Sequence, residues 1–188
     1  MSRKPILVKM TDMPSLESYS KMIKMLWKSK WITNNGTYAK QLTEKLKAYL
    51  GVSNLALLNN GTLTLHIALK TLNLPKGGEI ITTPFTFVAT TSTIVWEGFT
   101  PVFVDINPKT WNIEPEAIEK AITAHTVAIM PVHVYGNPCD VEAIDRIAKK
   151  YNLKVVYDAA HAFGVKALVI AGTTIPASSY FSNVAINS

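Results

Sequence analysis

Residues 154–164 read KVVYDAAHAFG, and the rest of the chain is best interpreted outward from this stretch. Val155, Val156 and Tyr157 form an apolar run that favours a strand, and Asp158 follows at once. A carboxylate at the end of a buried strand is costly unless it meets a positive partner, which at the end of a parallel strand is often a ligand. The alternative is an aspartate that caps the next helix or faces water. The stretch alone leaves both interpretations open.

Apolar runs and helical patterns alternate along the chain ahead of this stretch. The strand-like runs occupy residues 55–58, 79–83, 101–104, 126–132 and 154–157. The helical segments between them occupy residues 60–72, 87–96, 114–122 and 140–151. The strands are continuously apolar and not alternating, which is typical of parallel sheets that helices cover on both faces. The pattern therefore predicts an α/β fold with three layers, helix–sheet–helix, around a mainly parallel sheet.

Two amphipathic helices are predicted near the N-terminus, at residues 15–28 and 37–50, on either side of the turn-rich loop WITNNG at 31–36. The chain carries a net charge of +6, which would attract an anionic partner. Many of its lysines lie on these two helices, however, where they indicate solvated helix faces. Because no zinc knuckle, aromatic-basic sheet motif or basic tail accompanies them, the sequence disfavours nucleic-acid binding.

The composition sets further bounds. Hydrophobic residues make up 48% and charged residues 17%, which indicates a globular protein. No stretch offers the roughly 20 apolar residues of a membrane span, and residues 1–9 lack the apolar core of a signal peptide. We therefore expect no membrane association and a cytoplasmic location. The single cysteine, Cys139, fits a reducing compartment, and because no Cys/His cluster surrounds it we expect no metal site.

The carboxyl ends of the predicted strands bring several chemically useful residues to one edge of the sheet, where α/β proteins bind ligands. The residues at these ends are Asn60-Gly61-Thr62, Pro84-Phe85, Asp105, His133 and Asp158. A glycine-containing turn before a helix offers free backbone N–H groups to an anion, although Asn60 and Thr62 also suit a plain helix cap. Phe85 or Phe87 would stack on a flat heterocycle, or would simply be a core aromatic.

Taken together, a phosphate cradle, an aromatic plate and a carboxylate suit a planar, phosphorylated, basic heterocycle. Pyridoxal phosphate has all three features, because its ring nitrogen acts as an electron sink when an adjacent aspartate keeps it protonated. The sequence contains neither GxGxxG nor GxxxxGK[ST], so nucleoside triphosphate sites and a Rossmann-type dehydrogenase are disfavoured.

Four segments then carry a resemblance to a known family: LLNNGTLTLHIAL at 57–69, GGEIITTPFTFVATTSTIVWEGFTPVFVDI at 77–106, IMPVHVYGNPCDVEAI at 129–144 and KVVYDAAHAFGVK at 154–166. Their order and content resemble the N-terminal half of the DegT/StrS-type sugar aminotransferases, within the aspartate aminotransferase (fold type I) superfamily. The resemblance implies the large domain of that fold, pyridoxal phosphate or pyridoxamine phosphate as cofactor, glutamate as amino donor, and a homodimer. It also implies a nucleotide-linked keto sugar as substrate, used in amino-sugar and polysaccharide biosynthesis.

The resemblance also assigns cofactor-binding roles to particular residues. Gly61 and Thr62 would bind the phosphate, with Asn60 where the family usually has serine. Phe87 would stack on the ring, and Asp158 would pair with the ring nitrogen. His161 would lie near the ring hydroxyl, where many relatives have glutamine. The loop 31–36 and His133 are further residues implied to line the site.

One expected residue is missing, namely the Schiff-base lysine of this family, which follows the DAAHA motif by a few dozen residues. The only lysine after Asp158 is Lys166, which lies too close to it and in a different motif. We therefore assign no catalytic residue, and expect a truncated chain that is inactive alone. The alternatives are a non-catalytic cofactor-binding or interaction module, or a lysine-less sugar dehydratase relative.

The uncharged C-terminal segment fits this expectation. Residues 167–188 contain no Asp, Glu, Lys or Arg, and only 168–171 suggests regular structure. We expect an incomplete cofactor-binding domain over residues 1–166, with N-terminal helices at 15–50, and an atypical tail at 167–188 that a frameshift would explain. Such a cut would expose strand edges and apolar surface and so favour self-association.

Overall fold

The computed structural model describes residues 13–165 and 184–187. The chain divides into two compact units, Met1–Leu42 and Thr43–Ser188. The first unit holds helix α1 (Leu16–Ser29) and the beginning of helix α2 (Thr37–Leu50), and α2 continues into the second unit. Both helices lie within two residues of their predicted bounds. No helix in the described part of the chain is long and apolar enough to cross a membrane.

Local signals in the sequence account for the ends of α1. Ser15 caps its N-terminus, because the Ser15 hydroxyl accepts a hydrogen bond from the backbone N–H of Ser18. At the other end Lys30 adopts a left-handed conformation (φ 55°), and its N–H donates to the carbonyl of Leu26. The helix is therefore defined by its own sequence.

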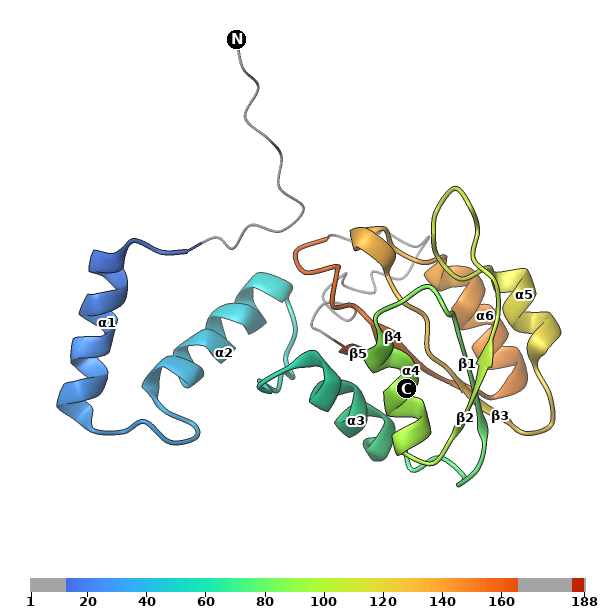
Figure 1. The fold of residues 1–188 in the computed structure, drawn as a ribbon, viewed down its shortest axis with the longest axis horizontal. Helices are drawn as coiled ribbons and strands as arrows, with labels where there is room; N and C mark the ends of the chain where they lie inside the picture. The colour runs from blue at the N-terminus through green and yellow to red at the C-terminus, as the bar shows by residue number, and fades with distance from the viewer. Residues whose placement is uncertain (1–12, 166–183, 188) are drawn as a thin grey trace, which may run out of the picture. The chain divides into compact units, whose positions relative to one another are not determined.

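The second unit is built on a five-stranded sheet (Figure 1). Its strands are β1 (Glu79–Thr82), β2 (Thr100–Phe103), β3 (Thr126–Ile129), β4 (Lys154–Asp158) and β5 (Val184–Asn187). Their order is β2-β1-β3-β4-β5; the first four are parallel, and β5 is antiparallel to β4. The predicted α/β fold with a mainly parallel sheet is confirmed.

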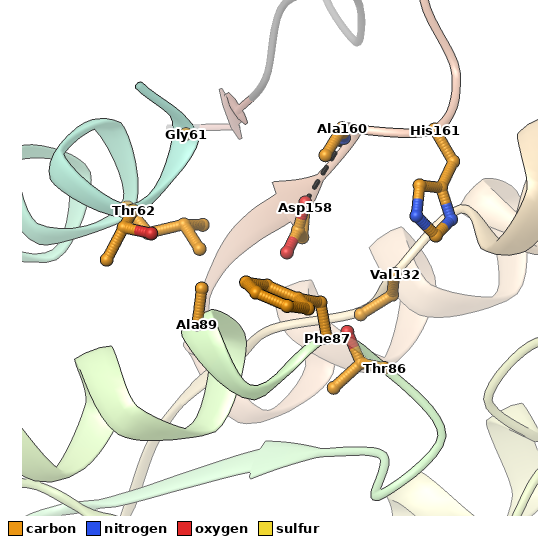
Figure 2. A pocket seen from close by; sticks show the side chains of 10 residues that line it. Gly61, Thr62, Thr86, Phe87, Ala89, Val132, Asp158, Ala160 and His161 are labelled. Atoms are coloured by element: carbon orange, nitrogen blue, oxygen red, sulfur yellow. Dashed lines mark hydrogen bonds between the residues drawn. The ribbon is translucent and has the colours of Figure 1, made fainter. Parts of the chain in front are cut away.

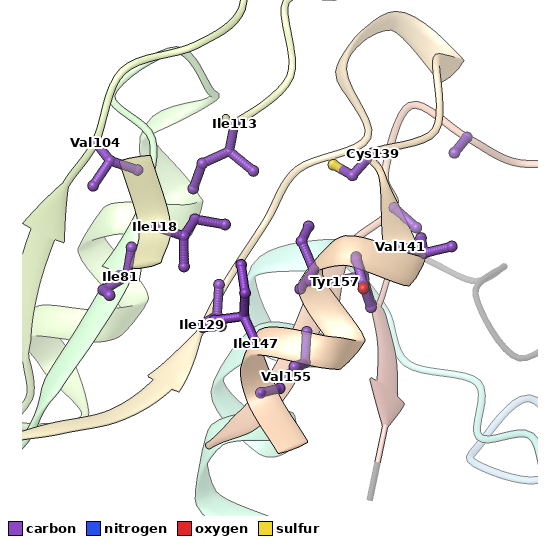
Figure 3. Close-up of a cluster of buried hydrophobic side chains, with 14 of the residues drawn as sticks. Ile81, Val104, Ile113, Ile118, Ile129, Cys139, Val141, Ile147, Val155 and Tyr157 are labelled. Atoms are coloured by element: carbon purple, nitrogen blue, oxygen red, sulfur yellow. The ribbon is translucent and has the colours of Figure 1, made fainter. Parts of the chain in front are cut away.

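Helices cover both faces of this sheet (Figure 1), and alternate strand residues point to opposite layers. Helices α3 (Gly61–Thr71) and α4 (Val88–Trp96) pack on the face that carries Ile80, Ala128 and Val156. Helices α5 (Pro115–Ala121) and α6 (Val141–Tyr151) pack on the face that carries Ile81, Ile129 and Val155, which Figure 3 shows. The apolar runs of the central strands arise because alternate residues of β1, β3 and β4 enter the two opposite cores.

Two sequence predictions about strands are wrong. Residues 55–58 form no strand in the structure, and the edge of β4 is taken by β5 instead. Strand β5 was not expected, because it lies in the uncharged segment that lacks a clear strand pattern. The predicted regular structure at 168–171 lies outside the described residues. Pairing between β5 and β4 also means that β4 is not the exposed edge expected of a chain cut after this strand.

The strand order places the site. Strand β1 lies between β2 and β3, so the chain leaves β1 toward one side and returns on the other side to form β3. Ligands bind in α/β proteins at the carboxyl ends of the strands beside such a reversal. The segments after β1, β3 and β4 therefore define where a functional site is expected.

Candidate functional site

A cavity of about 210 Å³ opens at the carboxyl ends of β1, β3 and β4, and we call it the Asp158 cavity (Figure 2). Its walls come from the start of α3, the β1–α4 junction, the segment after β3 and the end of β4. The lining residues are Gly61, Thr62, Leu65, Thr86, Phe87, Ala89, Val132, Asp158, Ala160 and His161. Five of the six residues predicted to bind a cofactor thus line one cavity, although they lie far apart in the sequence.

The sixth predicted residue, Asn60, caps α3 and is not part of the cavity lining. Its Oδ1 accepts the backbone N–H of Leu63 over 2.8 Å. The backbone N–H groups of Gly61 and Thr62 have no hydrogen-bond partner among the described residues, as is usual in the first turn of a helix. These two donors and the positive end of the α3 dipole lie at the cavity wall, where they could hold an anion. The helix cap at Asn60 is therefore present, and it leaves the N–H groups of Gly61 and Thr62 available to a ligand.

Asp158 ends strand β4 and is only 6% exposed. The hydroxyl of Thr90 donates to its Oδ2 over 2.8 Å, and the N–H of Ala160 donates to its Oδ1 over 3.1 Å. No ion pair of Asp158 is formed within the described part of the chain. A buried carboxylate that faces a cavity and has hydrogen-bond donors, but no ion-pair partner among the described residues, fits a cationic group of a ligand.

Thr90 and Thr86 are site residues that the sequence analysis missed. Thr86 lies just before α4 and Thr90 lies in its first turn, and their hydroxyl oxygens are 2.8 Å apart. Because the proton of Thr90 goes to Asp158, Thr86 must donate to Thr90, so a hydroxyl relay runs from the cavity wall to the carboxylate. The sequence contained a signal for Thr90: the threonines of segment 87–96 lower the helix propensity of that segment, and nothing in the local sequence explains why they are there.

Phe87 and His161 flank Asp158 in the Asp158 cavity (Figure 2). Phe87 is 69% exposed, so its ring face is free to stack on a flat ligand. His161 Nδ1 accepts the backbone N–H of Tyr135 over 3.3 Å. A neutral His161 ring then carries its proton on Nε2, which can donate to a ligand oxygen.

His133, expected to line the site, lies elsewhere. It is buried, its ring stacks on Tyr157 at a centroid distance of 4.9 Å, and its Nδ1 accepts the N–H of Cys139. Burial lowers the pKa of His133 to about 4 and raises the pKa of Cys139 to about 12, so both stay neutral near pH 7. The thiol of Cys139 donates to the carbonyl of Val132. Among the residues the structure describes, no cluster of His, Cys, Asp and Glu suits a metal ion.

Two further strand-end residues also stay outside the Asp158 cavity. Asp105 follows the edge strand β2 and its Oδ1 accepts the N–H of Ile106, so it stabilises its own turn. Phe85 contacts the rings of Trp111 and Tyr135 and not the cavity. Of the two candidate aromatic plates, the structure therefore places Phe87 at the site. The loop 31–36 belongs to the first unit, and Lys166 lies outside the described residues.

Comparison with known proteins gives one consistent result. The sequence profile of the DegT/DnrJ/EryC1/StrS aminotransferase family matches residues 16–182. The dTDP-4-amino-4,6-dideoxy-D-glucose transaminase of Escherichia coli is 50% identical to this chain over 165 residues. That match covers 88% of this chain and 44% of the E. coli protein, so the chain spans less than half the length of this relative.

Solved structures agree with the sequence match. The X-ray structure of the aminotransferase from Psychrobacter cryohalolentis superimposes with a TM-score of 0.75 at 34% identity, over 81% of this chain and 38% of that one. The crystal structure of NtdA from Bacillus subtilis, with bound cofactor PMP, gives a TM-score of 0.71 at 32% identity. It covers 84% of this chain and 38% of the NtdA chain. The described fold is thus similar to a part of each larger protein.

Proposed function

Because the chain belongs to the DegT/DnrJ/EryC1/StrS aminotransferase family, we propose that it binds pyridoxal phosphate or pyridoxamine phosphate in the Asp158 cavity. The proposed reaction of the whole protein is transfer of an amino group, with glutamate as donor, to a keto sugar linked to a nucleotide. The observation that carries this proposal is the buried carboxylate of Asp158, which faces the cavity without an ion-pair partner among the described residues.

Each part of the cofactor has a matching feature on the cavity wall. The N–H groups of Gly61 and Thr62, which have no partner among the described residues, would hold the phosphate, and the ring of Phe87 would cover one face of the heterocycle. The carboxylate of Asp158 would accept the proton on the ring nitrogen as a hydrogen bond. When bound, the cofactor supplies an electron sink whose strength depends on that protonated nitrogen.

The surrounding residues of this chain keep Asp158 ready for that role. The hydrogen bonds from Thr90 and Ala160 fix the direction of the carboxylate. The proton on Nε2 of His161 would be donated to the ring hydroxyl oxygen. Leu65, together with other apolar lining residues, reduces the water near these groups and so strengthens their electrostatic interactions.

The reaction also needs a base, and the family resemblance assigns this role to a lysine. After Asp158 the 188 residues contain one lysine, Lys166. We therefore propose that this chain supplies the cofactor-binding half of the site, and that turnover requires a lysine from outside these 188 residues. We also propose that two copies associate as in a homodimer. A cytoplasmic location is proposed because the one cysteine, Cys139, is free.

The test is a titration of the full chain with pyridoxal phosphate, followed by absorbance and by retention of cofactor on gel filtration. Asp158→Asn keeps the shape but removes the charge, and Asp140→Asn is the matched control because Asp140 caps α6 and Asn also caps well. We expect Asp158→Asn to weaken binding at least roughly tenfold, as for a lost buried ion pair, and Asp140→Asn to leave it unchanged. Equal affinity of all three proteins would overturn the proposed site.

Borohydride treatment of the loaded chain tests the lysine separately. We expect the cofactor to remain removable after reduction, because the described cavity wall contains no lysine. A specific lysine that becomes covalently labelled would show instead that these 188 residues contain a competent base. Strong binding without labelling and without any glutamate-dependent spectral change would favour the non-catalytic cofactor-binding module.

A further inference from the structure

Four aromatic rings form a continuous row that starts at the Asp158 cavity, and we call it the aromatic row: His161, Tyr135, Phe85 and Trp111. The rings of His161 and Tyr135 lie 6.0 Å apart and nearly parallel, at 6°. Tyr135 meets Phe85 edge-on at 6.2 Å, and Phe85 meets Trp111 at 5.4 Å. Only His161 lines the cavity, so the row leads from the cavity to a surface outside it.

Two exposed residues of the row, Trp111 and Tyr135, have unfavourable backbone conformations. Trp111 has φ 64° and Tyr135 has φ 53°, in the left-handed region that bulky residues rarely adopt. Despite this, Trp111 is 48% exposed and Tyr135 is 75% exposed. An aromatic side chain that is held in a strained conformation and left in contact with water contributes little to the core, which points to a role in binding.

Hydrogen bonds of Asn112 hold the segments that carry Trp111 and Tyr135 together. The buried side chain of Asn112, next to Trp111, donates to the carbonyls of Asn137 and Pro138, and its Oδ1 accepts the N–H of Val134. These contacts fasten the β2–α5 loop to the short 3-10 helix η1 (Val134–Gly136), which carries Tyr135. Both segments lie at the same end of the sheet (Figure 1). Trp111 and Tyr135 are therefore held in place before any ligand arrives.

The turn after Tyr135 also approaches the cavity segment closely. Gly136 has φ 81°, and a Cβ at this position would lie 3.1 Å from the carbonyl oxygen of His161. A glycine is thus required for η1 to pack against the end of β4. The same contact brings the Tyr135 N–H to Nδ1 of His161. The aromatic row is consequently joined to the wall of the Asp158 cavity at His161.

From this connection we propose that the aromatic row binds the base of the nucleotide-linked substrate, with the base stacked on Trp111. The inference rests on the proposed function, which puts the reacting sugar at the Asp158 cavity. In such a substrate the base lies at the opposite end from the sugar, beyond the phosphates. Trp111 is the last ring of the row, at the opposite end from His161 and the cavity. Stacking on an aromatic ring recognises the face that all bases share.

The test uses the full chain loaded with pyridoxal phosphate and titrated with thymidine diphosphate, with calorimetry and tryptophan fluorescence as readouts. Trp111→Asn removes the ring at a position where Asn accepts positive φ, and Trp111→Phe keeps an aromatic plate. Trp96→Leu is the matched control, because Trp96 is exposed on α4 and contacts His66 instead of the aromatic row.

We expect Trp111→Asn to weaken thymidine diphosphate binding roughly 5- to 150-fold, the range for one lost base stack. Trp111→Phe should lose less affinity but should abolish quenching of fluorescence by the nucleotide. Trp96→Leu should bind as the unaltered chain does. Because Asn relieves backbone strain, Trp111→Asn should unfold at a temperature no lower than Trp111→Phe. Should Trp111→Asn fail to fold, the loss of quenching in Trp111→Phe still decides the question.

Several outcomes would overturn the inference. Unchanged affinity in Trp111→Asn, or no binding of thymidine diphosphate to the unaltered chain, would exclude a base site on the aromatic row. If Trp111→Asn weakens binding of glucose 1-phosphate, titrated in parallel, but not of thymidine diphosphate, the row contacts the sugar instead of the base. A change in sedimentation without a change in nucleotide affinity would make the row a contact between copies. The proposed function fails separately, if the unaltered chain does not retain pyridoxal phosphate.

Discussion

Helices α4 and α6 cover opposite faces of the same sheet but are stabilised in different ways. Helix α6 has local support at both ends, because Asp140 caps its N-terminus and Asn152 ends it in a left-handed conformation. Lys149 and Asp145 add an ion pair one turn apart, with 2.6 Å between nitrogen and oxygen. Helix α4 has no side-chain cap, no acidic residue in its first turn and no basic residue in its last.

The difference follows from what each helix does. The N-cap position of α4 is held by Phe87, which lines the Asp158 cavity, and its interior carries the hydroxyl of Thr90. The buried hydroxyl of Thr93 has no hydrogen-bond partner within the described part of the chain. At positions where α6 uses residues that favour a helix, α4 uses residues that favour a site. A helix that forms a cavity wall can depart from local sequence rules when tertiary packing stabilises it.

The strongest test of the comparison is a truncation in the α6 layer. Ile144 is fully buried between α6 and the sheet, so Ile144→Ala should lower the free energy of unfolding by about 2–5 kcal/mol. Denaturant unfolding measures this loss, and Ile144→Val should cost only about 0.5–1.5 kcal/mol. Because α6 contributes nothing to the Asp158 cavity, the folded variant should bind pyridoxal phosphate normally. A large loss of cofactor affinity in folded protein would contradict the separation of the two layers.

The second prediction concerns acid sensitivity on the α6 side. The pKa of His133 is about 4 when buried but about 6.5 when exposed, so the unfolded chain binds the proton first. Stability should therefore decline by about 3 kcal/mol as pH falls from about 6.5 to 4, and should not change through this group above pH 6.5. His133→Asn keeps an acceptor for the Cys139 N–H but cannot be protonated. The difference in unfolding free energy between the two proteins should depend on pH over that window, and a constant difference would refute the assignment.

On the α4 side, the two buried threonines provide a matched pair. Thr90→Val removes the donor to Asp158, a charge-assisted bond of about 1.5–3 kcal/mol, so pyridoxal phosphate should bind at least roughly tenfold more weakly. Thr90→Ser should restore binding. Thr93→Val removes a hydroxyl without a partner and should raise the unfolding free energy by about 1 kcal/mol, with cofactor affinity unchanged. If Thr90→Val and Thr93→Val change the affinity for pyridoxal phosphate equally, Thr90 does not position Asp158.

The smallest expected effect compares the two N-caps directly. Asp140→Ala should destabilise the protein by about 1 kcal/mol through α6, whereas Phe87→Ser should stabilise it by about 0.5–1 kcal/mol by giving α4 a cap. The same Phe87→Ser change removes the proposed ring plate, so it should weaken pyridoxal phosphate binding several-fold. Thermal unfolding and cofactor titration on both variants test this. If Phe87→Ser gains stability and binds pyridoxal phosphate as tightly as the unaltered chain, Phe87 does not stack on the cofactor.

Much of the fold follows from local patterns. The helix bounds agree with the structure to within one or two residues, and four of the five predicted parallel strands are present. The prediction at 55–58 failed because an apolar run also occurs in an extended segment that packs on the core without pairing: Leu55 contacts one core cluster. The missed strand β5 lies among uncharged residues without an alternating strand pattern. It is a strand because it pairs with β4, a contact that the local sequence does not indicate.

The residues of the candidate site were predicted only in part, because some of them have local sequence signals and others do not. Glycine before a helix, an aspartate after a strand and the order of four motifs are local signals, and the family they indicated is confirmed. His133 was wrongly expected at the site because a residue at a strand end can turn either way, and its ring turned toward Tyr157. The donor of the bond to Asp158, Thr90, is 68 residues away, beyond the reach of any local pattern.

The sequence by itself determined the type of every α-helix and of the strands β1 to β4, and the chemistry available at the strand ends, because caps, turns and apolar runs act between neighbours in the chain. Only the tertiary structure decided which of these residues meet. Strand order and register bring α3, α4 and the end of β4 around one cavity, and the same arrangement aligns His161 with Tyr135, Phe85 and Trp111. Contacts between distant segments depend on the packing of the sheet and its helices, so Asp158 acquires the hydrogen bond from Thr90 only when β4 and α4 come together.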